Sequence, residues 1–108
     1  MIKIKIKIDK IDLPTKENLK KYNLDSSKVT INPDGSIDYS GNVNLSYKGL
    51  KEIPFKFNKV GGDFDCRSNQ LTTLEGSPVE VGRWFDCGNN SLTTLEFAPK
   101  KVGGLIYN

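Results

Sequence analysis

The chain has 108 residues and a mass of 12.0 kDa, with 36% hydrophobic and 27% charged residues, which indicates one compact unit. Its 16 basic and 13 acidic residues give a formal net charge of +3 spread over both halves of the chain, so no nucleic-acid-binding arm is indicated. The absence of histidine excludes Ser-His-Asp catalysis and histidine-ligated zinc, and two cysteines argue against a disulfide framework.

The first eight residues alternate between isoleucine and lysine after the initial methionine. This alternation predicts a half-buried strand with one apolar face and one charged face. We interpret the charged face as a solubilising surface that discourages edge-to-edge pairing. The alternative is a binding surface for an acidic partner or for nucleic acid, formed by Lys3, Lys5, Lys7 and Lys10.

Two further elements are expected before the middle of the chain. Residues 15–22 predict a short helix with Thr15 as its N-cap, ending before Asn23. Residues 33–35, Pro-Asp-Gly, form a turn cluster between two short strand-like runs, which predicts a β-hairpin. Residues 1–40 are therefore expected to form a small α+β cap.

Residues 41–108 contain an internal repeat with a period of 21 residues. Segment 60–80 aligns with segment 81–101, and weaker copies extend backward from residue 59 and forward to residue 108. A period of this length predicts stacked units that bury their apolar faces only against one another. The predicted fold is α+β: the N-terminal cap followed by a short solenoid of about three coils with a parallel sheet.

The spacing within each repeat, written FDCRSNQLTTL and FDCGNNSLTTL, resembles the leucine-rich repeat pattern L-x-L-x-x-N-x-L. The short period and the following proline are similar to short repeats of uncharacterised bacteriophage and bacterial proteins. The resemblance implies a non-enzymatic scaffold whose partner is recognised by variable surface positions. From its phage-borne examples it also implies an inhibitor of a bacterial host defence protein, such as a CRISPR effector. The first repeat departs from the pattern, because Lys48 stands where the others have Asn69 and Asn90.

Placing the repeat on strands directs one set of side chains inward: Val43, Leu45, Phe64, Cys66, Phe85, Cys87 and Ile106. Cys66 and Cys87 are predicted to be buried free thiols with a structural role, because their spacing is that of the repeat. Asn69 and Asn90 are predicted to be structural as well, with side chains that satisfy backbone groups between coils.

The outward positions carry an unusual change between repeats. Arg83 and Trp84 replace Gly62 and Asp63, and apolar side chains follow on the next strand. Aromatic and apolar side chains within a charged rim are typical of protein interfaces. We predict a partner-binding surface formed by Trp84, Leu105, Tyr107, Arg83, Arg67, Asp65 and Asp86. The alternatives are a self-association surface and an incidental patch.

No catalytic residue, metal ligand or cofactor site is predicted. Asp63, Asp65 and Asp86 are expected to be solvated, with ordinary pKa values and without the geometry of an acid/base pair or a calcium loop. The glycine pairs 61–62 and 103–104 are interpreted as turns that enter each strand, because no phosphate-binding motif follows them.

The sequence stops within the last predicted strand, so Leu105, Ile106 and Tyr107 are expected to present an open edge that favours homo-oligomers. No apolar run has membrane-spanning length, so we expect a cytoplasmic protein without a membrane partner. The predicted function is a non-enzymatic protein–protein interaction module that binds a host protein. The alternatives are a self-assembling homodimer and a nucleic-acid-binding accessory protein that uses the lysine face of residues 1–10.

Overall fold

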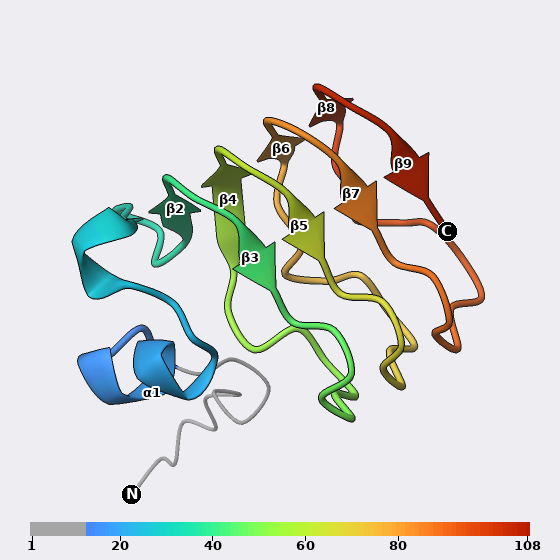
Figure 1. Cartoon of the computed structure of the whole chain (residues 1–108), viewed down its shortest axis with the longest axis horizontal. Helices are drawn as coiled ribbons and strands as arrows, with labels where there is room; N and C mark the ends of the chain where they lie inside the picture. The colour runs from blue at the N-terminus through green and yellow to red at the C-terminus, as the bar shows by residue number, and fades with distance from the viewer. Residues whose placement is uncertain (1–12) are drawn as a thin grey trace, which may run out of the picture.

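The computed structural model describes residues 13–108. Figure 1 shows a short helical segment at one end of the molecule, followed by stacked coils that run to the C-terminus. The predicted strand of alternating isoleucine and lysine, with its lysine face, lies outside the described residues.

Helix α1 (Lys16–Lys21) begins as predicted. The hydroxyl oxygen of Thr15 accepts the N–H of Asn18 at 3.1 Å, which satisfies one of the free donors at the helix start. Leu19, Tyr22 and Leu24 are buried, and the ring of Tyr22 meets the ring of Phe55 edge-on, with centroids 5.6 Å apart. The helical segment is thereby anchored on the first coil of the solenoid.

The predicted hairpin is confirmed. A short 3-10 helix, η1 (Ser26–Lys28), leads into β1 (Val29–Ile31), which pairs antiparallel with β2 (Ile37–Tyr39). Gly35 lies in the turn with a φ of 86°, a conformation that glycine adopts without a steric penalty. Strand β2 also pairs in parallel with β4 (Phe57–Val60), so the hairpin continues directly into a sheet of the repeats.

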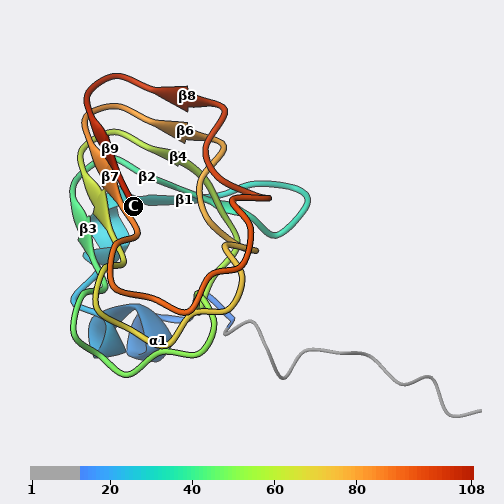
Figure 2. The ribbon, with the colours of Figure 1, turned by 90° about the vertical axis from the view of Figure 1, so that its right-hand side faces the viewer.

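Two sheets lie on adjacent sides of the coil, as Figure 2 shows end-on. One has the order β1-β2-β4-β6-β8, with β4 (Phe57–Val60), β6 (Glu80–Val81) and β8 (Lys101–Val102) parallel to β2. The other has the order β3-β5-β7-β9, from β3 (Val43–Asn44), β5 (Phe64–Asp65), β7 (Phe85–Asp86) and β9 (Ile106–Tyr107), all parallel.

Paired residues in neighbouring coils are 21 positions apart in sequence: Val60 pairs with Val81, and Phe64 with Phe85. The protein is therefore an α+β molecule built on a stacked-coil β-solenoid of about three turns. The sequence predicted one parallel sheet, whereas the structure has a second, formed by the residues that precede each glycine turn.

The core is a column of inward side chains repeated from coil to coil. Phe64 and Phe85 stack with ring centroids 5.8 Å apart and an interplanar angle of 14°. The predicted inward positions are buried except Ile106, which is 57% exposed whereas Phe85 at the same position is 1% exposed. The difference arises because, among residues 13–108, only one side of the last coil has a neighbouring coil.

The glycine pairs lie in the turns that enter the strands of the four-stranded sheet, as interpreted from the sequence, and they also permit a close approach of consecutive coils. A methyl group on Gly82 would overlap the carbonyl oxygen of Gly61, and one on Gly103 would overlap that of Gly82. Because the obstructing atoms are backbone, a side chain at Gly82 requires the two coils to move apart.

Candidate functional site

The outward side of the four-stranded sheet, here called the sheet face, carries the seven residues predicted to bind a partner. The register of β7 and β9 joins Phe85 to Ile106 and Asp86 to Tyr107, which places Trp84 beside Leu105. The rings of Trp84 and Tyr107 meet edge-on, with centroids 6.2 Å apart. Leu105 is 65% exposed, and the three side chains line a shallow depression with Arg83 and three turn glycines.

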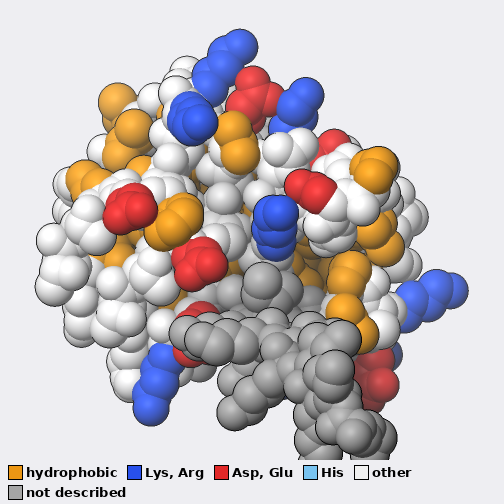
Figure 3. Space-filling view, turned by 180° about the vertical axis from the view of Figure 1, so that it is seen from behind, with side chains coloured by type: hydrophobic (Ala, Val, Ile, Leu, Met, Phe, Trp, Pro, Cys, Tyr) orange, Lys and Arg blue, Asp and Glu red, His pale blue; other side chains and the backbone are white. Residues whose placement is uncertain are grey.

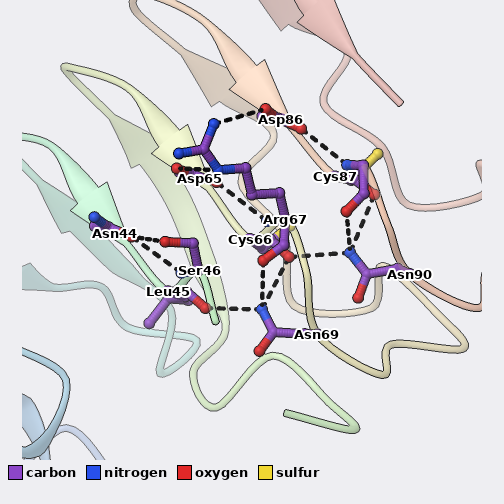
Figure 4. A network of polar contacts seen from close by, with 11 residues as sticks. Asn44, Leu45, Ser46, Asp65, Cys66, Arg67, Asn69, Asp86, Cys87 and Asn90 are labelled. Atoms are coloured by element: carbon purple, nitrogen blue, oxygen red, sulfur yellow. Dashed lines mark hydrogen bonds and ion pairs between the residues drawn. The ribbon is translucent and has the colours of Figure 1, made fainter. Parts of the chain in front are cut away.

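Charged side chains lie beside this aromatic pair. The guanidinium of Arg67 lies between two carboxylates, with its Nε 3.5 Å from Oδ2 of Asp65 and its Nη1 3.8 Å from Oδ2 of Asp86. Figure 4 shows this side chain between the two aspartates. Arg83 pairs with the third carboxylate, its Nε lying 3.6 Å from Oδ1 of Asp63.

The expectation that these carboxylates are fully solvated is wrong, because the side chains of Asp63 and Asp86 are 16% and 13% exposed and Asp65 is 5% exposed. Burial raises the pKa of the carboxyl group of Asp65, and the negative charges of Asp86 and Asp63 act in the same direction. A hydrogen bond from the backbone N–H of Arg67, and the positive charge of its side chain, oppose this rise. The long Arg67 side chain lies against Asp65 and contributes to its burial.

Asp65 and Asp86 also close the turn that follows each strand. In both residues Oδ1 accepts the backbone N–H two positions later, from Arg67 at 3.1 Å and from Gly88 at 2.9 Å. In the first coil Asn44 makes the same bond to the N–H of Ser46, at 3.0 Å. The turn therefore needs a side-chain oxygen at this position and does not need a negative charge.

Tyr47 is a residue of the sheet face that the sequence interpretation missed. It is 72% exposed, and the guanidinium of Arg67 lies over its ring, 5.9 Å from the centroid. Its φ of 55° lies in the left-handed region, as do those of Ser68 and Asn89 at the same repeat position. Asparagine adopts this conformation more readily than most residues, and an aromatic residue does so at a cost. The repeat alignment offered the signal: an aromatic residue where the other coils have serine and asparagine.

The side chains of Asn69 and Asn90 each connect two coils. Asn69 Oδ1 accepts the N–H groups of Lys48 and Leu50, both at 3.0 Å, and its Nδ2 donates to the carbonyl oxygens of Leu45 at 2.8 Å and Cys66 at 3.0 Å. Asn90 repeats the arrangement one coil later, with Leu71 as donor and Cys66 and Cys87 as acceptors. Lys48, at the first-coil position, contributes its backbone N–H.

Cys66 and Cys87 are free and buried. Burial raises the pKa of both thiols, so both stay protonated at neutral pH, and Cys87 Sγ lies 3.6 Å from the carbonyl oxygen of Tyr107. Within residues 13–108 no group of three or more cysteine and acidic side chains is arranged to hold a metal ion.

A pocket of about 630 Å³ lies apart from the sheet face, with Ile53, Phe57, Val79 and Phe97 among its lining residues. Phe97 is 52% exposed and has a φ of 71°, at the repeat position where Gly76 has a φ of 96°. Figure 3 shows the molecule from behind, where apolar side chains alternate with basic and acidic ones. The described part of that view has no stripe of one charge.

Comparisons with models of protein families, with curated proteins and with solved structures found no match for this chain. In the described part of the chain, no helix combines the length and the apolar character needed to cross a membrane. The structure places the chain among short β-solenoids with 21-residue coils and a small helical segment at one end.

Proposed function

We propose that this protein is a non-enzymatic protein–protein interaction module that binds its partner through the sheet face. The observation that carries the proposal is the edge-on pair of the half-buried Trp84 and the exposed Tyr107, which lies beside the exposed Leu105 and among ion pairs. Tryptophan, tyrosine and arginine are the residues that contribute most often to the binding energy of protein interfaces. An apolar centre with a charged rim is also how such interfaces are built.

Charge supports a protein partner over nucleic acid at this surface. The sheet face carries three carboxylates, Asp63, Asp65 and Asp86, and two guanidinium groups, Arg67 and Arg83. A phosphate backbone binds where basic groups outnumber acidic ones, and it is repelled where they do not.

The chemistry of the same residues supports a binding role over catalysis. The thiols of Cys66 and Cys87 are buried and protonated, whereas a nucleophilic cysteine needs an accessible thiolate. The carboxylates of Asp65 and Asp86 each close a turn and pair with Arg67, which gives both groups a structural role.

The resemblance of the repeat to phage-borne proteins suggests where to look for the partner. A bacterial host protein, for example a component of a defence system such as a CRISPR effector, is the partner class that we propose, and the host cytoplasm is the proposed compartment. We also propose, on the same resemblance, that the coils are of the leucine-rich-repeat type.

Self-association is the second candidate function, and a separate observation favours it. Leu105 and Ile106 are 65% and 57% exposed, and among residues 13–108 no strand pairs with the outer edges of β8 and β9. Unpaired edges beside apolar side chains favour pairing with another chain.

The test is an affinity capture from bacterial lysate with the wild-type chain, Trp84→Ala and Phe97→Gly, followed by mass spectrometry. Phe97→Gly is the matched control, because it removes an exposed ring that lies outside the Trp84 depression. We expect one protein to be captured by the wild type and by Phe97→Gly and to be lost with Trp84→Ala. Equal capture by all three chains would contradict the proposal.

The mass of each bait in solution decides between the two candidates. A monomeric wild type that captures a partner supports the interaction module. A wild-type dimer with no specific capture supports self-association, through the sheet face if Trp84→Ala separates it into monomers and through the edges of β8 and β9 if it does not.

A further inference from the structure

The sheet face carries one negative charge more than its ion pairs neutralise. Asp63 is paired with Arg83, whereas Asp65 and Asp86 share the single guanidinium of Arg67 at 3.5 and 3.8 Å. These distances lie beyond those of a close charge-assisted hydrogen bond, about 2.7–2.9 Å. One positive charge is therefore missing around the pair Asp65 and Asp86.

The fold does not account for this excess charge. Asn44 closes the equivalent turn of the first coil with a neutral side chain, so asparagine satisfies the turn at this position. Asp65 is instead a carboxylate at 5% exposure, where burial disfavours the charged form. Two acidic side chains at adjacent positions of a parallel sheet also repel one another.

Aromatic rings lie beside the excess charge. Tyr107 is the register partner of Asp86, and Trp84 precedes Asp86 by two residues, so it points to the same side of the sheet. At the other end, Tyr47 already holds the guanidinium of Arg67 over its ring, which shows that this face accommodates a cation on an aromatic surface.

We infer that the sheet face receives an arginine side chain of the partner protein, placed between the carboxylate of Asp86 and the rings of Trp84 and Tyr107. This inference rests on the proposed function and specifies the chemistry of its partner. Arginine suits the position better than lysine, because a planar guanidinium pairs with a carboxylate and stacks on aromatic rings at the same time. The incoming guanidinium supplies the positive charge that Asp65 and Asp86 lack.

Trp84 provides a direct probe, because it is the one tryptophan of the chain. The ligands are a short acetylated peptide with arginine between two leucines and the same peptide with neutral citrulline in its place. We expect the arginine peptide to change the Trp84 fluorescence and to bind about tenfold or more tightly than the citrulline peptide, as hydrogen bonds to charged groups predict. Equal binding of the two peptides, or no binding of either up to the limit of solubility, overturns the inference.

Two variants of the chain test whether the preference for the arginine peptide arises at Asp86. Asp86→Asn retains the oxygen that closes the turn, as Asn44 does, and removes the charge, so it is expected to abolish the preference for arginine. Glu80→Gln is the matched control, because it removes one negative charge from β6 in the other sheet. A preference for arginine that survives in Asp86→Asn, or one lost equally in Glu80→Gln, contradicts the assignment.

The failure of this inference is distinguishable from the failure of the proposed function. If the protein captured from lysate is lost with Trp84→Ala and retained with Asp86→Asn at every salt concentration, the sheet face binds a partner without an arginine contact. If Trp84→Ala leaves that capture unchanged, the sheet face itself is the wrong surface.

Discussion

Two parts of each repeat differ in how their sequence changes from coil to coil. One part is the turn that contains Asn69 or Asn90, and the other is the sheet face. At the turns, the residue is the same in both coils, and in each coil its side chain accepts an N–H and donates to a carbonyl oxygen of the preceding coil. On the sheet face the fold leaves the residue free to change, because Asp63 of one coil is replaced by Trp84 in the next. The identical asparagines therefore hold the coils together, whereas the changed positions of the sheet face, beside the aspartates that both coils share, are available for recognition.

The largest effect should come from breaking the repeated turn. Asn69→Ala leaves the N–H groups of Lys48 and Leu50 and the carbonyl oxygen of Leu45 without their partner, which should lower the free energy of unfolding by about 3 kcal/mol. Urea unfolding measures the change. Lys48→Ala, at the same repeat position, is expected to change stability by less than about 0.5 kcal/mol. Similar losses in both variants would contradict the role assigned to the asparagine.

The next largest effect concerns the close approach of the coils. Gly82→Ala pushes a methyl group against the carbonyl oxygen of Gly61 and should cost about 2 kcal/mol. Gly61→Ala meets its nearest atoms at an ordinary 3.7 Å and should be nearly neutral. Thermal unfolding of the two variants compares one position of the repeat in two coils. An equal loss of stability at both glycines would show that the coil spacing is not the cause.

A smaller effect is expected at the strained position of Phe97. Glycine adopts its φ of 71° without the penalty that any residue with a Cβ incurs, so Phe97→Gly should be more stable than Phe97→Ala by about 1 kcal/mol. In strand β4, the same pair of substitutions at Lys59 should give the opposite order, because glycine weakens a regular strand. Chemical denaturation of the four variants measures which substitution is the more stable at each position. The same order at the two positions would contradict the strain at Phe97.

The smallest effect is the pH dependence that Asp65 contributes. Its folded pKa is raised above the ordinary value, so the folded state binds the proton more tightly than the unfolded state. The contribution of Asp65 to stability therefore decreases as pH rises from the unfolded pKa of about 3.8 through the folded pKa. Relative to the wild type, Asp65→Asn should be more stable at neutral pH, and this advantage should diminish in acid.

Asp34 has the opposite effect on how the free energy of unfolding depends on pH. Hydrogen bonds from Ser36, followed by Lys56, lower its pKa to about 2, so its contribution to stability is lost as pH falls from 3.8 toward 2. The free energy of unfolding of Asp65→Asn and of the wild type is measured by urea unfolding at each pH. Subtracting one value from the other cancels the contribution of Asp34, which both chains contain. A difference that stays constant with pH would show that the folded state does not raise the pKa of Asp65.

The repeat alignment predicted the fold well wherever one coil stacks on another. Identity at an offset of 21 placed Phe64 on Phe85, with the two cysteines in the core, because stacked coils must present the same side chain to the same layer. The N-cap at Thr15 and the turn at Gly35 were predicted from local chemistry.

The sequence predictions were wrong or incomplete where the environment of a residue depends on neighbours that the repeat does not specify. Strand β6 of the second sheet places Val81 in the core while Val79, two residues earlier, is 44% exposed, so no apolar alternation marks this strand as it marks the predicted one. The burial of Asp65 depends on a long Arg67 side chain that other coils lack. The exposure of Tyr47 depends on a left-handed turn that an aromatic residue rarely adopts.

The central claim is that the partner binds the sheet face, and site-specific crosslinking tests it most directly. A photoreactive benzoylphenylalanine at Tyr47 and, in a separate chain, at Phe97 places the same group at two exposed aromatic positions with positive φ, one on the sheet face and one beside the other pocket. We predict that the captured partner crosslinks to the chain labelled at position 47 and not to the chain labelled at position 97. Crosslinking at position 97 alone would contradict this prediction and would place the partner beside the pocket that Phe97 lines.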